Sequence, residues 1–252
     1  MSSELAGIPL LDRDGIARKA ELERRHWWYR GRRRVLEAAL ARLEIPTPCE
    51  VLDLGCGTGA TLEALSRYGE VSGIDVNPHA VDWARRRGVG EVREAGVERI
   101  HYEDGRFGLI TCLDVLEHVE DDGAALAEAA RVAAPGGLLV ITAPAYQRLF
   151  SGHDIAAGHR RRYSLRALRG LAEGSGWTRV LSTHFNSVLL PAAAARRALT
   201  RSARKPRSDL LATPRFVDGP LFGLLALEAL LVRAGARLPA GLSILLALRL
   251  PG

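Results

Sequence analysis

A glycine-rich stretch followed by a lone aspartate is the first group of residues whose types and spacing indicate chemistry. The stretch Asp53-Leu-Gly-Cys-Gly-Thr-Gly59 follows an apolar run, and Asp75 ends a second apolar run 20 residues after Gly55. Glycines at such a turn let the backbone approach a ligand beside the free N–H groups of the next helix. A carboxylate at the second position can accept hydrogen bonds from both ribose hydroxyls. Both features predict a nucleotide-like ligand, and nicotinamide dehydrogenases share them.

The second group combines carboxylates with histidines. Asp114, Glu117 and His118 follow the apolar run 107–113. A neutral imidazole can accept a proton near neutral pH, which makes His118 the leading candidate for a general base. His153 and His159 lie in a later polar stretch and are further candidate catalytic residues. The alternative is that these side chains only hydrogen-bond their own loops.

The elements that must position these groups follow from hydrophobic periodicity. Between residues 50 and 143, short apolar runs alternate with stretches of helical period, which predicts βαβ units and a doubly wound, mostly parallel sheet. Ligands of such sheets bind at the carboxyl ends of the strands. The expected strands span 50–54, 71–75, 89–93, 107–113 and 137–143, and the expected helices span 59–68, 78–87 and 123–133.

The flanking segments are predicted from the same pattern. Before the sheet, residues 16–43 are expected to be helical with a break at Gly31. After it come a polar loop, a helix, a strand, two helices around a Pro- and Arg-rich connection, and a final strand. These span 146–162, 165–173, 177–183, 185–237 and 242–250.

The charge distribution is uneven. The 252 residues carry 35 Lys and Arg against 29 Asp and Glu, a formal net charge of +6. Residues 160–207 hold eleven Arg and one Lys against Glu173 alone, so the remainder carries 23 basic and 28 acidic side chains. This basic segment fits an anionic substrate or a membrane surface, and the alternative is a solvated arginine-rich surface without a partner. It contains few aromatic side chains for base stacking, so no nucleic-acid partner is expected.

The cellular compartment is predicted from what the sequence lacks. Three cysteines without CxxC spacing indicate neither a disulfide framework nor a zinc site. The first residues have no signal-peptide pattern, and the apolar run 221–232 is too short to span a bilayer. We expect a cytoplasmic protein, with peripheral membrane contact as an alternative.

Four ordered motifs together resemble one enzyme family. Residues 51–59, Gly73-Ile-Asp75, residues 107–119 and Ala134-Pro-Gly-Gly137 are similar to the motifs of class I S-adenosylmethionine-dependent methyltransferases. The segments 26–32 and 158–164 resemble elements of one bacterial branch. The resemblance covers residues 50–145 closely and implies a seven-stranded Rossmann-like sheet.

The same resemblance implies a domain organisation. Residues 1–45 are expected to form a helical N-terminal lid, and residues 46–252 the methyltransferase domain. Within that domain we expect a cofactor core at 50–145, a substrate loop at 146–163 and a helical insertion at 185–238.

The resemblance also implies the contacts with S-adenosylmethionine. Asp53 is expected to organise the loop and the cofactor's amino group, Asp75 to hold the ribose, and Val76 to pack on adenine. The family often has Asp beside the adenine amino group, where this sequence has Ala95-Gly-Val-Glu98, so that contact is expected from backbone. The implied cofactor-binding residues of the core are Asp53, Gly55, Cys56, Gly57, Asp75, Val76, Gly96, Val97, Leu113 and Asp114. Cys56 is expected to contribute backbone only.

Aromatic side chains outside the core are candidates to enclose the ligands. Trp28 and Arg30 are expected to close over the cofactor, with Arg30 pairing with its carboxylate. The predicted substrate-binding residues are Trp27, Tyr29, Tyr146 and Tyr163. The alternative for the N-terminal aromatics is simple packing of a helix on the sheet.

The leading functional hypothesis is methyl transfer to an oxygen or nitrogen of a small, partly apolar molecule. The alternatives are a peripheral-membrane methyltransferase acting on a lipid or quinone, and a non-catalytic cofactor-binding or scaffold protein. A dehydrogenase fits the glycines alone. Asp114, Glu117 and His118 resemble the Glu-x-x-Glu-His metal site of quinone-pathway O-methyltransferases, but the sequence by itself assigns no metal.

Overall fold

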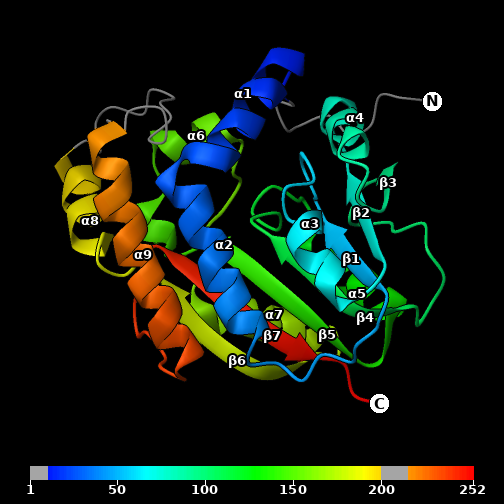
Figure 1. The fold of residues 1–252 in the computed structure, drawn as a ribbon. Helices are drawn as coiled ribbons and strands as arrows, with labels where there is room; N and C mark the ends of the chain where they lie inside the picture. Colours follow the sequence, from blue (N-terminus) through cyan, green and yellow to red (C-terminus); the bar gives the residue numbers. More distant parts are fainter. Residues whose placement is uncertain (1–10, 200–214) are drawn as a thin grey trace.

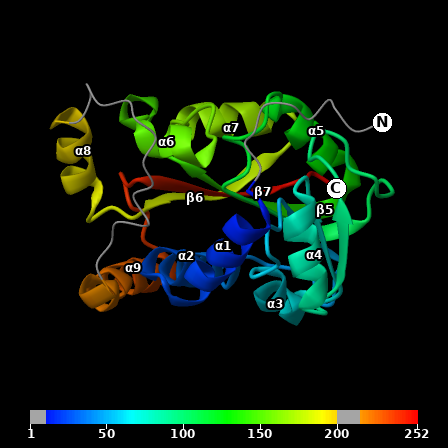
Figure 2. The same cartoon turned by 90° about the horizontal axis from the view of Figure 1, so that it is seen from above.

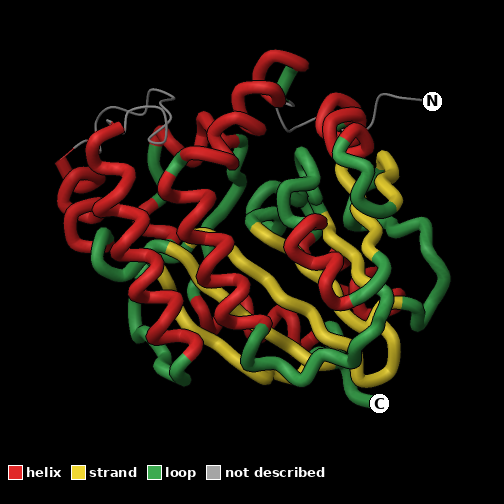
Figure 3. Tube along the Cα trace, viewed as in Figure 1, coloured by secondary structure: helices red, strands yellow, loops and turns green. Residues whose placement is uncertain are grey.

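The computed structural model describes residues 11–199 and 215–252, which form a seven-stranded sheet with helices on both faces (Figures 1 and 3). The strand order is β3-β2-β1-β4-β5-β7-β6, and all pairs are parallel except those of β7 with β5 and β6. The predicted doubly wound, mostly parallel sheet is therefore confirmed. The strands are β1 Val51–Leu54, β2 Val71–Asp75, β3 Glu91–Glu94, β4 Phe107–Leu113, β5 Ala133–Pro144, β6 Thr178–Phe185 and β7 Ser243–Arg249.

The central strands are apolar throughout because both of their faces are covered. All four residues of β1 are buried, and β4 is buried over six of its seven residues. Successive side chains of β1 join different hydrophobic clusters, Leu52 and Leu54 on one side and Val51 on the other. This division follows from the alternation of side chains across a strand.

The helices form a layer on each face, as seen from above in Figure 2. One layer contains α5 and α7, and the opposite layer contains α2, α3, α4 and α9 (Figure 2). The helices are α1 Arg13–Arg25, α2 Trp27–Leu40, α3 Leu62–Leu65, α4 Pro78–Arg86, α5 Asp122–Val132, α6 Gly152–Ala157, α7 Leu165–Gly174, α8 Leu190–Leu199 and α9 Asp218–Arg233. Short 3₁₀ turns occupy Ser66–Tyr68, Gln147–Leu149 and Arg215–Val217.

The N-terminal helices are divided at His26, and the predicted break at Gly31 is wrong. His26 is extended, and its Nδ1 accepts a hydrogen bond from the backbone N–H of Trp28 at 3.2 Å, which caps α2. Gly31 lies inside α2, where a Cβ would overlap the side chain of Leu225 on α9. The glycine therefore permits close packing of two helices and does not interrupt one.

Other element boundaries also differ from the predictions. The helix expected at 59–68 is reduced to α3 and a 3₁₀ turn, because the glycine loop continues with Gly59 at a φ of 77°. The polar segment 146–162 contains the short helix α6. β5 begins at Ala133, which pairs with Phe107 of β4, four residues before the expected start.

Candidate active site

The glycine loop joins β1 to α3 at the carboxyl end of the sheet. Gly55 and Gly57 have φ values of 68° and 55°, in the left-handed region that favours glycine. The Cys56 N–H donates to the carbonyl of Ile74 on β2 at 2.9 Å. Asp75 Oδ2 accepts from the Gly57 N–H at 2.8 Å. The loop is thus held against the end of β2 by two backbone donors.

Asp75 fixes two chain segments at once. Its Oδ1 accepts from the N–H of Asn77 at 2.8 Å, while its Oδ2 holds Gly57. Asn77 in turn caps α4 by accepting from the N–H groups of His79 and Ala80. The carboxylate retains lone pairs for further donors, as a ribose requires.

The backbone at Gly55 leaves no room for a side chain. A Cβ there would lie 2.5 Å from Val115 Cγ2, whereas Gly88, with the same φ of 68°, has nothing within 4 Å. We expect Gly55→Ala to lower the free energy of unfolding by about 2–4 kcal/mol, from backbone strain and overpacking together. Gly88→Ala, the matched control, should lower the free energy of unfolding by about 1–2 kcal/mol, because it introduces backbone strain without overpacking.

Urea denaturation of both variants measures this difference. Adding Val115→Ala to the Gly55→Ala variant should remove most of the excess, because the contact is then lost. Equal destabilisation of the two single variants would contradict the steric explanation.

Asp53 is a buried acid below the glycine loop. Its Oδ1 accepts from the Thr111 hydroxyl at 2.6 Å, and the residue is 3% exposed. Burial raises the pKa of Asp53 to about 7, against the opposing effects of Thr111 and Arg32. A cationic ligand group next to Asp53 would stabilise its ionised form. The thiol of the neighbouring Cys56 has a pKa raised by burial, so Cys56 is unsuited to act as a nucleophile.

Asp114 is engaged on both of its oxygens. Arg32 of α2 forms an ion pair with Oδ2, and the Thr142 hydroxyl donates to Oδ1 at 3.0 Å. The residue has a positive φ of 56° directly after β4. This pair links the N-terminal helix to the carboxyl end of the sheet.

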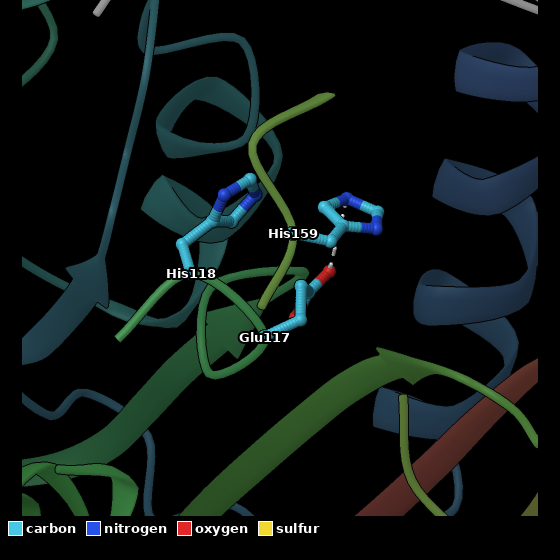
Figure 4. Close-up of side chains that lie close together, drawn as sticks. All are labelled: Glu117, His118 and His159. Atoms are coloured by element: carbon cyan, nitrogen blue, oxygen red, sulfur yellow. Dashed lines mark ion pairs between the residues drawn. The ribbon is translucent and has the colours of Figure 1, made fainter. Parts of the chain in front are cut away.

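A cluster of one carboxyl group and two imidazoles lies beside these groups (Figure 4). Glu117 and His118 come from the loop after β4, and His159 comes from the loop after α6. His118 Nδ1 lies 3.2 Å from the carbonyl oxygen of Gly158, and the two imidazole rings are edge to face at 4.8 Å. His159 Nε2 lies 3.9 Å from Glu117 Oε1. The fold therefore brings together residues that are about 40 positions apart.

Burial determines the protonation of this cluster. Burial, followed by the effect of His159, lowers the pKa of His118 to about 4. Burial, followed by the effect of Asp114, raises the pKa of Glu117 well above its usual range. His118 is therefore neutral near pH 7, as the general-base prediction requires.

His159 is oriented by a second buried acid, Asp154. His159 Nδ1 and Asp154 Oδ1 are 2.9 Å apart, and Arg162 Nε donates to the same oxygen at 2.7 Å. Asp154 Oδ2 accepts from the N–H and hydroxyl of Ser151 and closes the capping box of α6. Asp154 is fully buried and Arg162 is 7% exposed, so this pair is isolated from solvent.

These groups share one cavity of about 870 Å³. It extends from the glycine loop to the histidine cluster, with residues of α1, α2 and α8 also contributing to its wall. Fifteen residues predicted for the site line it: Asp53, Gly55, Cys56, Gly57, Asp75, Val76, Val97, Leu113, Asp114, Trp27, Trp28, Tyr29, His118, His153 and His159.

Four predicted residues do not line this cavity: Gly96, Arg30, Tyr146 and Tyr163. The guanidinium of Arg30 lies over the Phe222 ring at 4.2 Å, so the expected carboxylate contact is not supported. The Tyr163 hydroxyl lies within hydrogen-bond distance of Asp122 Oδ2, at 2.6 Å, in the core. Tyr146 stacks on His184. The last two side chains have structural partners where substrate contact was expected.

The sequence did contain signals for two basic residues that were missed. Arg32 is four residues after Trp28 and therefore lies on the same face of α2, whereas Arg30 points elsewhere. Lys19 follows Ile16 by three residues on α1 and lines the cavity beside Gly57. Helical periodicity through the segment would have selected both residues.

The orienting pair Asp154 and Arg162 was also missed. The two residues are eight positions apart, with α6 and the loop after it between them, so no regular period relates them.

Comparison with known proteins identifies the fold. The family model described as "Methyltransferase domain" matches residues 52–141. An uncharacterized 37.1 kDa transposon protein of Streptomyces fradiae is 30% identical over 213 residues, which are 73% of this chain and 62% of that protein. A ubiquinone biosynthesis O-methyltransferase of Xanthomonas oryzae is 37% identical over 114 residues, 42% of this chain and 47% of that enzyme. The chain thus matches less than two thirds of the length of these relatives.

Solved structures show the same architecture over nearly the whole chain. A methyltransferase of Haloferax volcanii, solved in complex with a methyltransferase activator, superposes with a TM-score of 0.63 at 19% identity. The match covers 95% of this chain and 97% of that protein. Residues 52–141 therefore form a methyltransferase domain, and the strand order, with the glycine loop and Asp75, gives the chain the fold of class I S-adenosylmethionine-dependent methyltransferases.

Proposed function

We propose that the protein transfers the methyl group of S-adenosylmethionine to an oxygen or nitrogen of a small, partly apolar molecule. The observation that carries this proposal is the shared cavity, in which the glycine loop and Asp75 face the same space as Glu117, His118 and His159. Its volume lies within the range of about 300–1,000 Å³ typical of small-molecule sites.

The residues at the glycine-loop end fit the cofactor. We infer that Asp75, which borders the glycine loop, accepts the ribose hydroxyls and that Asp53, a buried acid, faces the cationic amino group. Val76 and Val97 also line the cavity and offer apolar contacts. S-adenosylmethionine supplies an activated methyl group on a sulfonium, so the protein needs chiefly to align the acceptor.

The apolar part of the cavity wall suits a partly apolar acceptor. Trp27, Trp28, Leu36 and Leu189 are among the residues that line the cavity. The imidazoles of His118 and His159 are polar groups in the same cavity and can orient an acceptor or assist loss of its proton. The catalytic roles of these residues and of His153 remain predictions.

Calorimetry and a labelled-methyl assay test the proposal. S-adenosylmethionine and its demethylated product should bind, and label from the cofactor should reach hydroxyl- or amino-bearing aromatic acceptors. Tight NADH binding without binding of either methionine compound would overturn the assignment. Cofactor binding without transfer to any acceptor would favour the non-catalytic alternative.

Cofactor affinity should depend on the pH because of Asp53. Its carboxylate attracts a cationic amino group only when ionised, and its pKa is about 7 in the unliganded protein. Affinity should therefore be highest above pH 7 and fall by up to about tenfold for each pH unit below it. Calorimetric titration with the cofactor at pH values between about 5.5 and about 8.5 measures how its affinity changes with pH.

Asp53→Asn is the control for this titration. It should bind the cofactor weakly and with little pH dependence over the same interval, since the amide does not ionise. An unchanged slope in this variant would assign the titration to another group.

A second candidate, action on a lipid or quinone at a membrane surface, is favoured by the outer face of α9. Leu227 is 55% exposed and Leu230 is 64% exposed. The one charged residue between the ends of α9, Glu228, points inward and accepts hydrogen bonds from three backbone N–H groups. No helix within residues 11–199 and 215–252 has the length and apolarity to cross a membrane. Part of the basic segment, residues 200–207, lies outside the described residues.

Vesicle flotation tests this second candidate. If α9 docks on a bilayer, the protein should float with vesicles containing anionic lipid at low salt, and Leu227→Asp with Leu230→Asp should abolish flotation. Val180→Asp, at an exposed apolar residue of β6, should float normally. Absence of salt-sensitive flotation would remove the membrane alternative.

A further inference from the structure

We propose that Glu117, His118 and His159 bind a divalent transition-metal cation in the wall of the cavity. Each residue offers one ligand atom, and these atoms all lie within 4.8 Å of one another (Figure 4). All three residues line the cavity, so a bound cation would be reached from the space in which the acceptor is placed.

Both imidazoles are held so that the same nitrogen is left free. His118 Nδ1 faces the Gly158 carbonyl oxygen, which only accepts hydrogen bonds, so Nδ1 carries the proton and Nε2 keeps its lone pair. His159 Nδ1 faces Asp154 Oδ1, and its Nε2 is turned to Glu117. A carboxylate or carbonyl behind the imidazole is the usual support of a metal-bound histidine, because it fixes the ring and raises its basicity.

Glu117 supplies an independent sign of a ligand. Its side chain is fully buried, and neither carboxyl oxygen accepts a hydrogen bond from any residue within the described ranges. Buried polar groups without partners are rare and costly in folded proteins. Since Oε1 faces His159 Nε2 at 3.9 Å, a cation between the two would provide the missing partner.

The ligand set also indicates which cation binds. Two imidazole nitrogens and one carboxylate suit Mn²⁺, Zn²⁺, Co²⁺ or Fe²⁺, whereas Mg²⁺ prefers oxygen ligands. Three protein ligands leave at least one position open, as in catalytic metal sites. Asp114 does not belong to this set, because Arg32 and Thr142 occupy its oxygens. The third ligand is His159, from a loop about 40 residues further along the chain.

The function of the cation rests on the proposed methyl transfer, although the site itself does not. With the cation bound, His118 and His159 would act as ligands and not as bases, because the metal takes their Nε2 lone pairs. A hydroxyl-bearing acceptor bound at the open position would have its O–H polarised, so that its proton leaves to solvent more readily. The acceptor oxygen then forms the bond to the methyl carbon as the carbon–sulfur bond breaks, and that electron pair remains on sulfur. This role of the cation fits an acceptor that is methylated on a hydroxyl oxygen.

Calorimetry on the full chain tests the site directly. Protein freed of metal with a chelator, and of any histidine tag, is titrated with MnCl₂, CoCl₂, ZnCl₂ and MgCl₂. We expect one Mn²⁺, Co²⁺ or Zn²⁺ per chain and weaker Mg²⁺ binding. Glu117→Gln and His159→Ala should each weaken Mn²⁺ binding by at least about tenfold. His101→Ala, which removes an exposed imidazole outside the cavity, should bind as the parent does.

Thermal unfolding provides a readout independent of affinity. Metal-free Glu117→Gln should be at least as stable as the parent, since it loses a buried carboxyl group without hydrogen bonds. Mn²⁺ should raise the Tm of the parent and leave that of Glu117→Gln unchanged. Stoichiometric binding that survives Glu117→Gln, or no binding of any of these cations, would overturn the site.

Cofactor calorimetry on the same samples separates the two proposals. Cation binding without S-adenosylmethionine binding would support the metal site and contradict the proposed function. S-adenosylmethionine binding and methyl transfer without cation binding would remove the metal site alone.

Discussion

Asp75→Ala is expected to weaken S-adenosylmethionine binding by about 10- to 100-fold. The Asp75 carboxylate accepts hydrogen bonds from the N–H groups of Gly57 and Asn77, and we propose that it also holds the ribose. Hydrogen bonds to an ionised group contribute about 1.5–3 kcal/mol each, and about 1.4 kcal/mol corresponds to a tenfold change in affinity. The variant therefore loses ligand contacts and releases the glycine loop from β2. Calorimetric titration with the cofactor measures the loss.

The matched control for this prediction is Asp82→Ala. Asp82 is an exposed acid on α4, the helix that follows Asp75, and it does not line the cavity. It should bind the cofactor with the parent's affinity, which excludes a general effect of removing a negative charge. If Asp75→Ala folds normally and binds the cofactor as tightly as the parent, the assignment of Asp75 to the ribose is wrong.

Arg162→Met is expected to lower the free energy of unfolding by about 3–5 kcal/mol. The guanidinium contacts Asp154 in the protein interior, where the arginine side chain is 4% exposed and the aspartate is fully buried. Removing one partner of a buried pair leaves the other charge without compensation, and this costs more than the pair itself contributes. Arg162 also donates to the Ala145 carbonyl at 3.1 Å, a bond that methionine does not replace. Urea denaturation measures the change.

The neighbouring arginine is the control for this prediction. Arg160 pairs with Glu120, whose side chain is 81% exposed, so Arg160→Met should change the free energy of unfolding by no more than about 1 kcal/mol. Similar losses of unfolding free energy in the two variants would show that burial of the Asp154–Arg162 pair does not increase the effect of removing the arginine. The comparison also tests whether this pair fixes the loop at residues 146–163, since Asp154 contacts His159 and Ser151 as well.

The sheet and the cofactor end of the site could be predicted from sequence because their signals are local. The apolar runs of β1, β2 and β4 are continuous because both of their faces are covered. Each run has an aspartate at or next to its carboxyl end: Asp53, Asp75 and Asp114. In a parallel sheet the carboxyl ends of adjacent strands meet, so Asp53 and Asp75 had to approach one another. The structure places both in the wall of the same cavity.

The aromatic segment before the core shows where local signals become insufficient. Helical periodicity groups Arg32 with Trp28 on one face of the helix, but it does not show which neighbour that face contacts. In α2, Arg30 contacts Phe222 of α9, whereas Arg32 reaches Asp114 at the end of β4. The rotation of the helix is set by its packing on α9, where Gly31 admits Leu225. That contact joins residues far apart in the chain.

The sequence by itself determined the fold class, the glycine loop and the carboxylate beside it, because these depend on hydrophobic period, glycine conformation and strand order. Only the tertiary structure decided that His159 joins Glu117 and His118 and that Asp114 turns to Arg32. The physical reason is that α6 and the Asp154–Arg162 pair fold the loop after β5 back over the sheet. Such packing of separate elements has no period in the sequence.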